Sequence, residues 1–585
     1  MDNRTKLTFM LIVGWALCMV FAVIGFFVYI QLGDGDATSS GEAQSVSTPL
    51  PANAVHVEIY SSNTKQDWMN QIIETFNAEK HVVDDNVIVV TVKHVGSGSS
   101  MNAILDDEAK PVVWSPGSDL WVTNINQAWK DRTGQEIISD ECPATLRLPL
   151  AIAMWKPMAE ALGWPNKPVG WDDLAKLAND PDGWAMYGHP EWGQFKFGHP
   201  HPEHSNSGML SIVAEVYSAA QLTEGLTVDI VKSKPVVESL GAIEQQVFHY
   251  GKKDTDILRK MTNRGPQYLH AVTSYESNVI KWNRDNADQL RFPFVAIYPD
   301  DGTFWVENPY CILDKADWVD DTQKKGAVQF RDYLLAEEQQ KLAIDWGLRP
   351  ADLGILLHAP IDIEHGAVPS ITPNEVPHLA YPSNEIVGHI IDTWHQVKKK
   401  ATIIMLMDTS GSMQGAKIKQ AVEGAAVFFE QMDPNDEVYL VTFSNTVIES
   451  PNSGKVGQVG ESLRLSLDGL FAEGGTALYQ AIIKSLERAE QLKTEDEANG
   501  EKRTYGIVVL SDGQDSIDGG PSWNDVLSSL PSGDEASDVK LYTVAYGDDA
   551  DTDILATLAN RTNGKIFTGD VENITDVYFL ISSEF

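Results

Sequence analysis

A long uncharged run near the N-terminus constrains this chain more than any other feature. Leu7–Ile30 holds 24 residues without a charge, and at about 1.5 Å per residue a helix of that length crosses a bilayer. Two basic residues precede the run and two aspartates follow it closely, which orients the N-terminus toward the cytoplasm. We expect a cytoplasmic segment at 1–6, a single transmembrane helix at 7–31 and an extracytoplasmic remainder. A cleaved signal peptide is the alternative.

The composition describes a folded, acidic, multidomain protein. The chain has 585 residues, 43% of them hydrophobic, and its 83 acidic and 44 basic residues give a net charge of −39. This length and apolar content predict two or three domains with cores of their own. The acidic balance argues against a nucleic-acid partner and against docking on anionic lipid. Contact with the membrane is therefore expected through the one helix alone.

Two changes in composition divide the chain. Residues 32–53 are rich in Ser, Gly, Ala and Pro and are expected to be a flexible tether. Residues 365–383 contain four prolines, which disfavour helix and sheet. Together with an amphipathic helix that follows, they predict a connector at 365–399 that permits independent motion of its neighbours. The folded domains are expected at 54–364 and 400–585.

Both domains alternate strand-like and helix-like segments, the pattern of a parallel sheet covered by helices. In the first domain, apolar strand-like runs at 55–60, 87–92 and 111–114 alternate with helical patterns at 67–77 and 99–105. In the second, the strands are expected at 402–407, 438–443, 506–510 and 541–545, and the helices at 417–431, 477–491, 554–561 and 574–581. The predicted fold class is α/β throughout.

Oxygen-bearing side chains follow the strands of the second domain. Asp408, Ser410 and Ser412 come directly after the run TIIMLM, Thr476 opens a helix after two glycines, and Asp512 follows the strand YGIVVL. Ligands bind beyond the carboxyl ends of the strands in such a sheet. Hard oxygen donors with few charges favour Mg²⁺, or else Mn²⁺ or Ca²⁺. The alternative is that these residues only cap helices and turns.

This constellation resembles the metal-ion-dependent adhesion site of von Willebrand factor A domains, and the resemblance covers about residues 401–585. It implies a Rossmann-like, doubly wound domain that binds a divalent cation through the two serines and Thr476. The two aspartates would act directly or through water. An Asp or Glu carboxylate of a protein partner would complete the coordination. Because the domain carries a net charge of −18 over 400–585, the cation would supply the local positive charge that an acidic partner needs.

Three clusters of Ser and Gly follow strands or open helices in the first domain. They are SSN at 61–63, GSGS at 96–99 and SPGS at 115–118. Amide groups at helix starts, with hydroxyls beside them, suit an anion or a polar ligand. Ordinary turn chemistry explains any one of the clusters equally well.

The order of these and later segments, such as VAIYPDDGTFWVENPYCIL and FRDYLLAEEQQKLAIDWGLRP, resembles extracellular solute-binding proteins of the type 2 periplasmic-binding class. The resemblance implies one lobe from 54–148 and 295–364, a second lobe from 149–294, and a small solute or oxyanion closed between them by hinge motion. The residues implied to line this cleft are Ser61, Ser99, Ser115, Ser207, Glu276 and Tyr298. An unpaired Glu276 would repel a bare oxyanion, so ligands with a donor group or a bound metal stay open.

Cysteine and histidine give weaker signals. Cys142 and Cys311 lie near the two implied hinge strands, and outside the cytoplasm they form either a disulfide or two buried thiols. The motif HPHPEH contains His199, His201 and His204. Its prolines favour an irregular, solvated loop over a zinc site.

These expectations describe a membrane-tethered, extracytoplasmic binding or adhesion protein with a solute cleft and a cation site for a protein partner. A substrate receptor for an ABC-type importer is the first alternative. A metal-dependent enzyme is the second, but the sequence contains no HExxH motif and no convincing nucleophile–base pair, so we expect no enzyme.

Overall fold

The computed structural model describes residues 54–585 apart from 204, 513, 531–538, 548 and 583. The predicted cytoplasmic segment, transmembrane helix and tether all lie outside the described residues. Within the part that is described, no helix is both long enough and apolar enough to span a bilayer.

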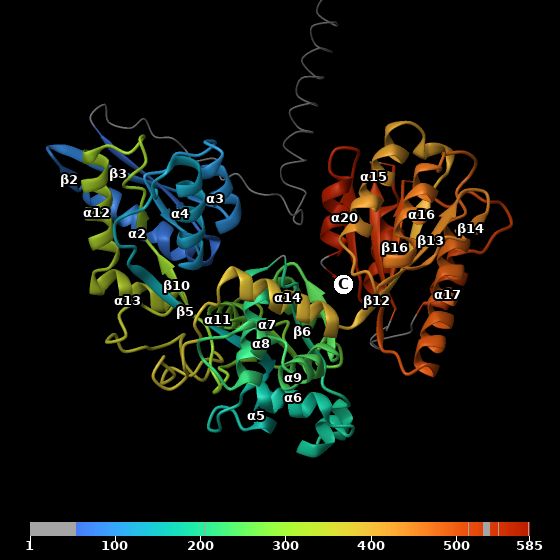
Figure 1. The fold of residues 1–585 in the computed structure, drawn as a ribbon, viewed down its shortest axis with the longest axis horizontal. Helices are drawn as coiled ribbons and strands as arrows, with labels where there is room; N and C mark the ends of the chain where they lie inside the picture. Colours follow the sequence, from blue (N-terminus) through green and yellow to red (C-terminus); the bar gives the residue numbers. More distant parts are fainter. Residues whose placement is uncertain (1–53, 204, 513, 531–538, 548, 583) are drawn as a thin grey trace, which may run out of the picture. The chain divides into compact units, whose positions relative to one another are not determined.

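The first lobe is a five-stranded sheet in the order β11-β4-β1-β3-β2. β1 pairs in parallel with β3 and β4, and buried and half-buried residues alternate along it, as expected for a strand with two unequal faces. Figure 1 shows α12 and α13 in yellow-green beside the blue strands, so the chain returns to this lobe after building the second one. The strands are β1 (Val55–Ser61), β2 (Val82–Val83), β3 (Asn86–His94), β4 (Val113–Ser115) and β11 (Cys311–Ile312); the helices are η1 (Asn63–Lys65), α2 (Gln66–Glu79), α3 (Ser97–Leu105), α4 (Leu120–Thr133), α12 (Asp321–Leu334) and α13 (Glu337–Asp345).

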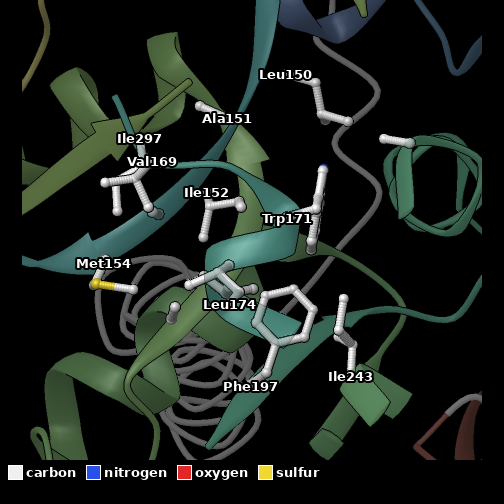
Figure 2. Close-up of a cluster of buried hydrophobic side chains, with 14 of the residues drawn as sticks. Leu150, Ala151, Ile152, Met154, Val169, Trp171, Leu174, Phe197, Ile243 and Ile297 are labelled. Atoms are coloured by element: carbon white, nitrogen blue, oxygen red, sulfur yellow. The ribbon is translucent and has the colours of Figure 1, made fainter. Parts of the chain in front are cut away.

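The second lobe is built on the long strand β5, in a sheet with the order β10-β5-β8-β6-β7 to which β9 adds beside β5. Figure 2 shows Ile152, Trp171, Leu174 and Phe197 in its apolar core. The strands are β5 (Ala144–Trp155), β6 (Phe197–Pro200), β7 (Val247–Gly251), β8 (Ala271–Tyr275), β9 (Phe294–Ile297) and β10 (Trp305–Pro309). The helices are α5 (Lys156–Leu162), α6 (Trp171–Asn179), η2 (Gly183–Tyr187), η3 (Pro190–Trp192), α7 (Asn206–Ala220), α8 (Val228–Val231), α9 (Lys234–Glu244), α10 (Asp254–Arg264) and α11 (Glu276–Asp285).

Two features of the second lobe differ from the sequence expectations. The sequence predicts that the chain returns to the first lobe at residue 295, whereas β9 and β10 still pair with β5 and β11 is the first strand that pairs in the first lobe's sheet. The HPHPEH segment is not a solvated loop at its start. His199 lies on β6, fully buried, with Nε2 3.1 Å from the Glu244 carboxylate, and His201 is also buried.

The proline-rich segment 365–383 has neither helix nor strand, as predicted, but it is bound to the second lobe. Backbone groups of 376–380 pair with Thr303, Trp305 and Tyr217. The following helix α14 (Asn384–Val397) buries Ile390 and Trp394 in the same core. Trp394 Nε1 donates to Glu244 at 2.9 Å. This connector is therefore part of the second lobe rather than a free linker.

His395 near the end of α14 is flanked by two carboxylates. Its Nε2 lies 3.3 Å from Glu203 and its Nδ1 lies 3.4 Å from Asp433. Burial opposes the charged imidazole, but the two carboxylates outweigh it and raise the pKa of His395 to about 9.

The C-terminal domain is a doubly wound sheet in the order β14-β13-β12-β16-β17-β18, with β15 beside β13. β12 to β13, β16 to β17 and β17 to β18 are parallel pairs, and so is β12 to β16. The expected strands and helices are confirmed. The strands are β12 (Lys400–Asp408), β13 (Glu437–Phe443), β14 (Val447–Glu449), β15 (Gly454–Lys455), β16 (Arg503–Ser511), β17 (Val539–Tyr546) and β18 (Lys565–Gly569). The helices are η4 (Gly411–Met413), α15 (Ala416–Glu430), α16 (Val456–Asp468), α17 (Leu478–Ala498), α18 (Trp523–Ser529), α19 (Thr552–Arg561) and α20 (Ile574–Ser582).

The central strand β12 explains why this sheet is covered on both faces. Met405 and Met407 belong to one apolar cluster, whereas Ile404 and Leu406 belong to another. Successive side chains of a strand point to opposite faces, so the continuous apolar run reads as a strand buried on both sides.

Candidate functional site

The residues predicted to bind a metal lie where the strand order of the C-terminal sheet reverses, between β12 and β16. Ligands bind at such a switch point, beyond the carboxyl ends of the strands. Asp408 is the last residue of β12 and Asp512 follows β16 directly. Both carboxylates are buried, so the two turns present their oxygens at one edge.

Hydrogen bonds join four of the five predicted residues. Asp408 Oδ1 accepts from the Ser410 amide at 2.8 Å. Ser410 Oγ lies 2.9 Å from Ser412 Oγ, and Ser412 Oγ donates to Asp512 Oδ1 at 2.7 Å. Because Ser412 uses its proton on Asp512, Ser410 must be the donor in the first of these two contacts.

Thr476 reaches the same edge through the backbone of its loop. The Gly411 amide donates to the Gly474 carbonyl at 3.0 Å, and the Glu473 amide donates to Thr409 at 2.8 Å. Gly474 has a φ of +87°, where a Cβ would meet the Asn445 side chain at 2.7 Å, so glycine suits this close approach. Thr476 itself is buried.

Lys417 is part of this edge, although sequence reasoning missed it. Its Nζ lies 2.6 Å from Asp512 Oδ2, and its carbonyl accepts from the Tyr546 hydroxyl at 3.1 Å. The pKa of Asp408 is raised, first by burial and further by the nearby Asp512 carboxylate, while hydrogen bonds from Ser410 and Ser511 oppose the rise.

The donor set fits a hard divalent cation. Two carboxylates and three hydroxyls supply only oxygens. Among the residues that the structure describes, no group of three or more His, Cys, Asp or Glu side chains forms a metal site, so a cation here would depend on the Ser and Thr oxygens. A low ligand charge leaves a bound cation with positive charge to offer a partner.

A cavity of about 360 Å³ lies between residues of the two lobes. The first lobe contributes the start of α3 and the turn after β1, and the second lobe contributes the start of α7 and two lysines. Its polar lining includes Ser62, Thr64, Ser97, Ser205, Ser207, Lys252 and Lys253, and its apolar lining includes Trp121, Leu148 and Val306.

Of the six residues predicted for this cleft, Ser207 lines the cavity. Ser61 is buried and donates to a backbone carbonyl at 3.3 Å. Ser115 is buried and donates to the Pro309 carbonyl at 2.6 Å. Ser99 is exposed on α3 and lies outside the cavity lining. The cluster positions were useful, but neighbouring serines of the same clusters face the cavity instead.

Glu276 and Tyr298 belong to a buried network with Arg349. Arg349 Nε donates to Glu276 Oε1 at 2.8 Å, and a terminal guanidinium nitrogen donates to Oε2 at 2.6 Å. The Tyr298 hydroxyl also donates to Oε2. Burial and then the Glu276 charge raise the pKa of Tyr298 well above its usual value. Glu276 is thus paired within the protein, and the repulsion of an oxyanion by an unpaired carboxylate does not arise.

The Cys142–Cys311 pair forms a disulfide, with the Cα atoms 4.6 Å apart. It ties the segment before β5 to β11, where the chain enters and leaves the second lobe. A disulfide of this kind persists in an oxidising environment.

Two family models match the chain. Bacterial extracellular solute-binding protein matches residues 57–349 and von Willebrand factor type A domain matches residues 402–578. Curated relatives include an uncharacterized protein of Synechocystis, 25% identical over 177 residues (29% of this chain, 38% of the relative), and inter-alpha-trypsin inhibitor heavy chain H4 of Sus scrofa, 27% identical over 129 residues (22% and 13%). This chain therefore covers at most 38% of those relatives' own length.

Solved structures found in the comparison include the sulfate-binding protein SubI of Mycobacterium tuberculosis, 17% identical with a TM-score of 0.35 over 56% of this chain and 96% of that one. A von Willebrand factor type A protein of Catenulispora acidiphila is 15% identical, with a TM-score of 0.27 over 32% and 42%. Both matched families typically bind rather than catalyse, and the first indicates work outside the cytoplasm. The chain belongs to the bacterial extracellular solute-binding proteins and carries a von Willebrand factor A domain after its solute-binding domain.

Proposed function

We propose that this protein is a membrane-tethered, extracytoplasmic binding protein that uses a divalent cation to hold a protein partner and a cleft to hold a small solute. The observation that carries the first half is the hydrogen-bonded series Ser410–Ser412–Asp512 at the switch point of the C-terminal sheet. Asp408, Ser410, Ser412, Thr476 and Asp512 would hold Mg²⁺, or else Mn²⁺ or Ca²⁺. The cation supplies a positive centre for a partner's Asp or Glu carboxylate.

The chain's own residues fit this role. The Asp408 and Asp512 carboxylates are buried and oriented by hydroxyl and amide donors, so little ordering is left for binding. Outside this edge the domain is strongly acidic. A partner with an exposed carboxylate would therefore be repelled at long range and attracted only at the cation, and salt should assist encounter by screening the repulsion.

The cleft would take an anionic solute. Lys252 and Lys253 line the cavity, and the N-termini of α3 and α7 contribute amide groups and serine hydroxyls. With Glu276 neutralised by Arg349, the lining residues carry net positive charge. A small oxyanion is the class that this lining fits best.

Titration calorimetry on the whole protein tests both halves. Mg²⁺ should bind the wild type and fail to bind Asp408→Ala, while Asp518→Asn, which removes an exposed carboxylate from the loop after Asp512, should bind normally. Sulfate, molybdate and phosphate should bind in preference to neutral amino acids and sugars. If Asp408→Ala binds Mg²⁺ as well as the wild type does, the cation site is refuted. If the cleft binds sugars selectively, the proposal that it binds anions is refuted.

The alternative function, a substrate receptor of an ABC-type importer, differs from the proposed one because it requires a permease as partner. We rank it second because the A domain and its cation edge have no part in that role.

A further inference from the structure

Lys65 is a fully buried lysine directly beneath the cleft. It ends the short helical turn η1 after β1, and only 1% of its surface is exposed. Its Nζ donates to Ser62 Oγ at 2.9 Å, to the carbonyls of Ser115 and Pro116 at 3.0 and 3.2 Å, and to Asn308 Oδ1 at 3.1 Å. All four acceptors are neutral, so no carboxylate among them balances the ammonium charge.

These contacts determine which of the hydroxyl groups near the solute donate hydrogen bonds and which accept them. An ammonium group only donates, so Ser62 accepts from Lys65 and must send its own proton elsewhere. Ser62 Oγ lies 2.9 Å from Thr64 Oγ1, and Thr64 donates to Asn308 Oδ1 at 3.2 Å. Ser62 and Thr64 both line the cavity. Lys65 therefore leaves Ser62 as a donor, toward Thr64 or toward an oxygen of the solute.

The side chain of Asn308 also keeps a hydrogen-bond donor, Nδ2, on the face of β10 that borders the cavity. Lys65 and Thr64 donate to its Oδ1, which turns Nδ2 away from them, and that buried Nδ2 has no hydrogen-bond acceptor among the residues that the structure describes. Asn308 and Val306 lie on the same face of β10 because strand side chains alternate, and Val306 lines the cavity.

We propose that Lys65 is the positioning residue that gives the cleft its preference for anions, by supplying a buried positive charge and by orienting Ser62 as a donor. This inference rests on the proposed anion-binding cleft and names the residue that sets the selectivity of that cleft. Lys65 need not touch the solute; it acts through Ser62 and through its charge.

The protonation of Lys65 should respond to the solute. Burial lowers its pKa to about 7. The titratable side chains on the surrounding elements are Asp67 on α2, His94 on β3, Asp119 in the β4–α4 turn and Glu307 on β10, and Lys252 and Lys253 line the cavity from the facing lobe. The oxygens of the β4–α4 turn and β10 that accept from Lys65 Nζ are all neutral. A bound anion favours the ammonium form, so binding at pH 8 should draw a proton from the buffer.

Asn308→Asp is the decisive variant. It keeps the size of the side chain and an oxygen acceptor for Lys65, and it places a carboxylate at the position now 3.1 Å from Nζ. That carboxylate would hold the lysine charged and balance its charge in place. Lys65→Met is the second variant, with Glu160→Gln, an exposed position of α5 in the second lobe, as the control.

The experiment is calorimetry of sulfate, molybdate and phosphate binding to the whole protein at pH 8, in buffers with different ionisation enthalpies. We expect the wild type to take up close to one proton per bound anion. Asn308→Asp and Lys65→Met should bind at least ten-fold more weakly and take up none, whereas Glu160→Gln should match the wild type.

Unchanged affinity in both Lys65→Met and Asn308→Asp would overturn the role of Lys65 and leave the proposed anion-binding cleft intact. If the wild type binds none of the three oxyanions, both the cleft proposal and this inference fail.

Discussion

Replacing Glu276 with glutamine should destabilise the solute-binding domain without weakening solute binding. Glu276 and Arg349 are 1% and 5% exposed and form a two-point ion pair. The substitution leaves the Arg349 charge buried without its counter-ion, and breaking a buried pair in this way costs about 3–5 kcal/mol. Glutamine keeps one acceptor for Arg349, so we expect about 3 kcal/mol.

Urea unfolding followed by tryptophan fluorescence measures this loss. Of the 16 tryptophans, only Trp523 lies within 400–585, so the signal reports mainly the solute-binding domain. With a slope of about 3 kcal/mol per molar urea, the midpoint should fall by about 1 M. The double variant Glu276→Gln, Arg349→Met should recover part of the loss because it removes the buried charge.

The control is Glu160→Gln, which breaks an exposed i,i+4 pair with Lys156 and should shift stability by less than about 0.5 kcal/mol. An unchanged urea midpoint for Glu276→Gln, together with weaker oxyanion binding, would refute the reasoning. That result would indicate that Glu276 binds the solute in the cleft, as the sequence predicts.

Three further predictions follow from charged and covalent contacts. Lys417→Met should bind Mg²⁺ about ten-fold more tightly by calorimetry, because it removes a cation 2.6 Å from Asp512; Lys417→Arg should match the wild type, and weaker binding by Lys417→Met would contradict this. Cys142→Ser should lower the free energy of unfolding by about 2–4 kcal/mol, since the disulfide closes a loop with a sequence separation of 169; the wild type in reducing agent should match the variant, and equal stability of the variant and the oxidised wild type would contradict a bridge. The folded pKa of His395 is raised to about 9 from 6.5, so its stabilising charge is fully present below about pH 6.5 and is lost as the pH rises through 9. The difference in thermal midpoint between wild type and His395→Gln should shrink over that range, and a constant difference would contradict the assignment.

The residues that share a continuous motif were the ones the sequence could predict. Asp408, Ser410 and Ser412 occupy one turn after an apolar strand, and a doubly wound sheet brings Asp512 to the same edge. Side-chain direction decided what was missed. Lys417 lies on the first turn of α15, and nothing in the spacing indicates that its ammonium reaches Asp512.

In the first domain the decisive partners are far apart in the chain. Arg349 pairs with Glu276 at a sequence separation of 73 residues, and His199 contacts Glu244 at a sequence separation of 45 residues. A polar, proline-containing segment therefore reads as a solvated loop although it is buried. The segment 365–383 is bound to the second lobe largely through its own backbone groups, which side-chain patterns do not reveal.

One crossed titration tests the central claim most directly. The claim is that a single chain carries a cation site and an anion-binding cleft as separate binding sites. Mg²⁺ and the best-bound oxyanion are each titrated by calorimetry into the wild type, Asp408→Ala and Asn308→Asp. We predict that Asp408→Ala loses only Mg²⁺ binding and that Asn308→Asp loses only oxyanion affinity. Loss of both ligands in either variant, or of neither ligand in both, would contradict the account.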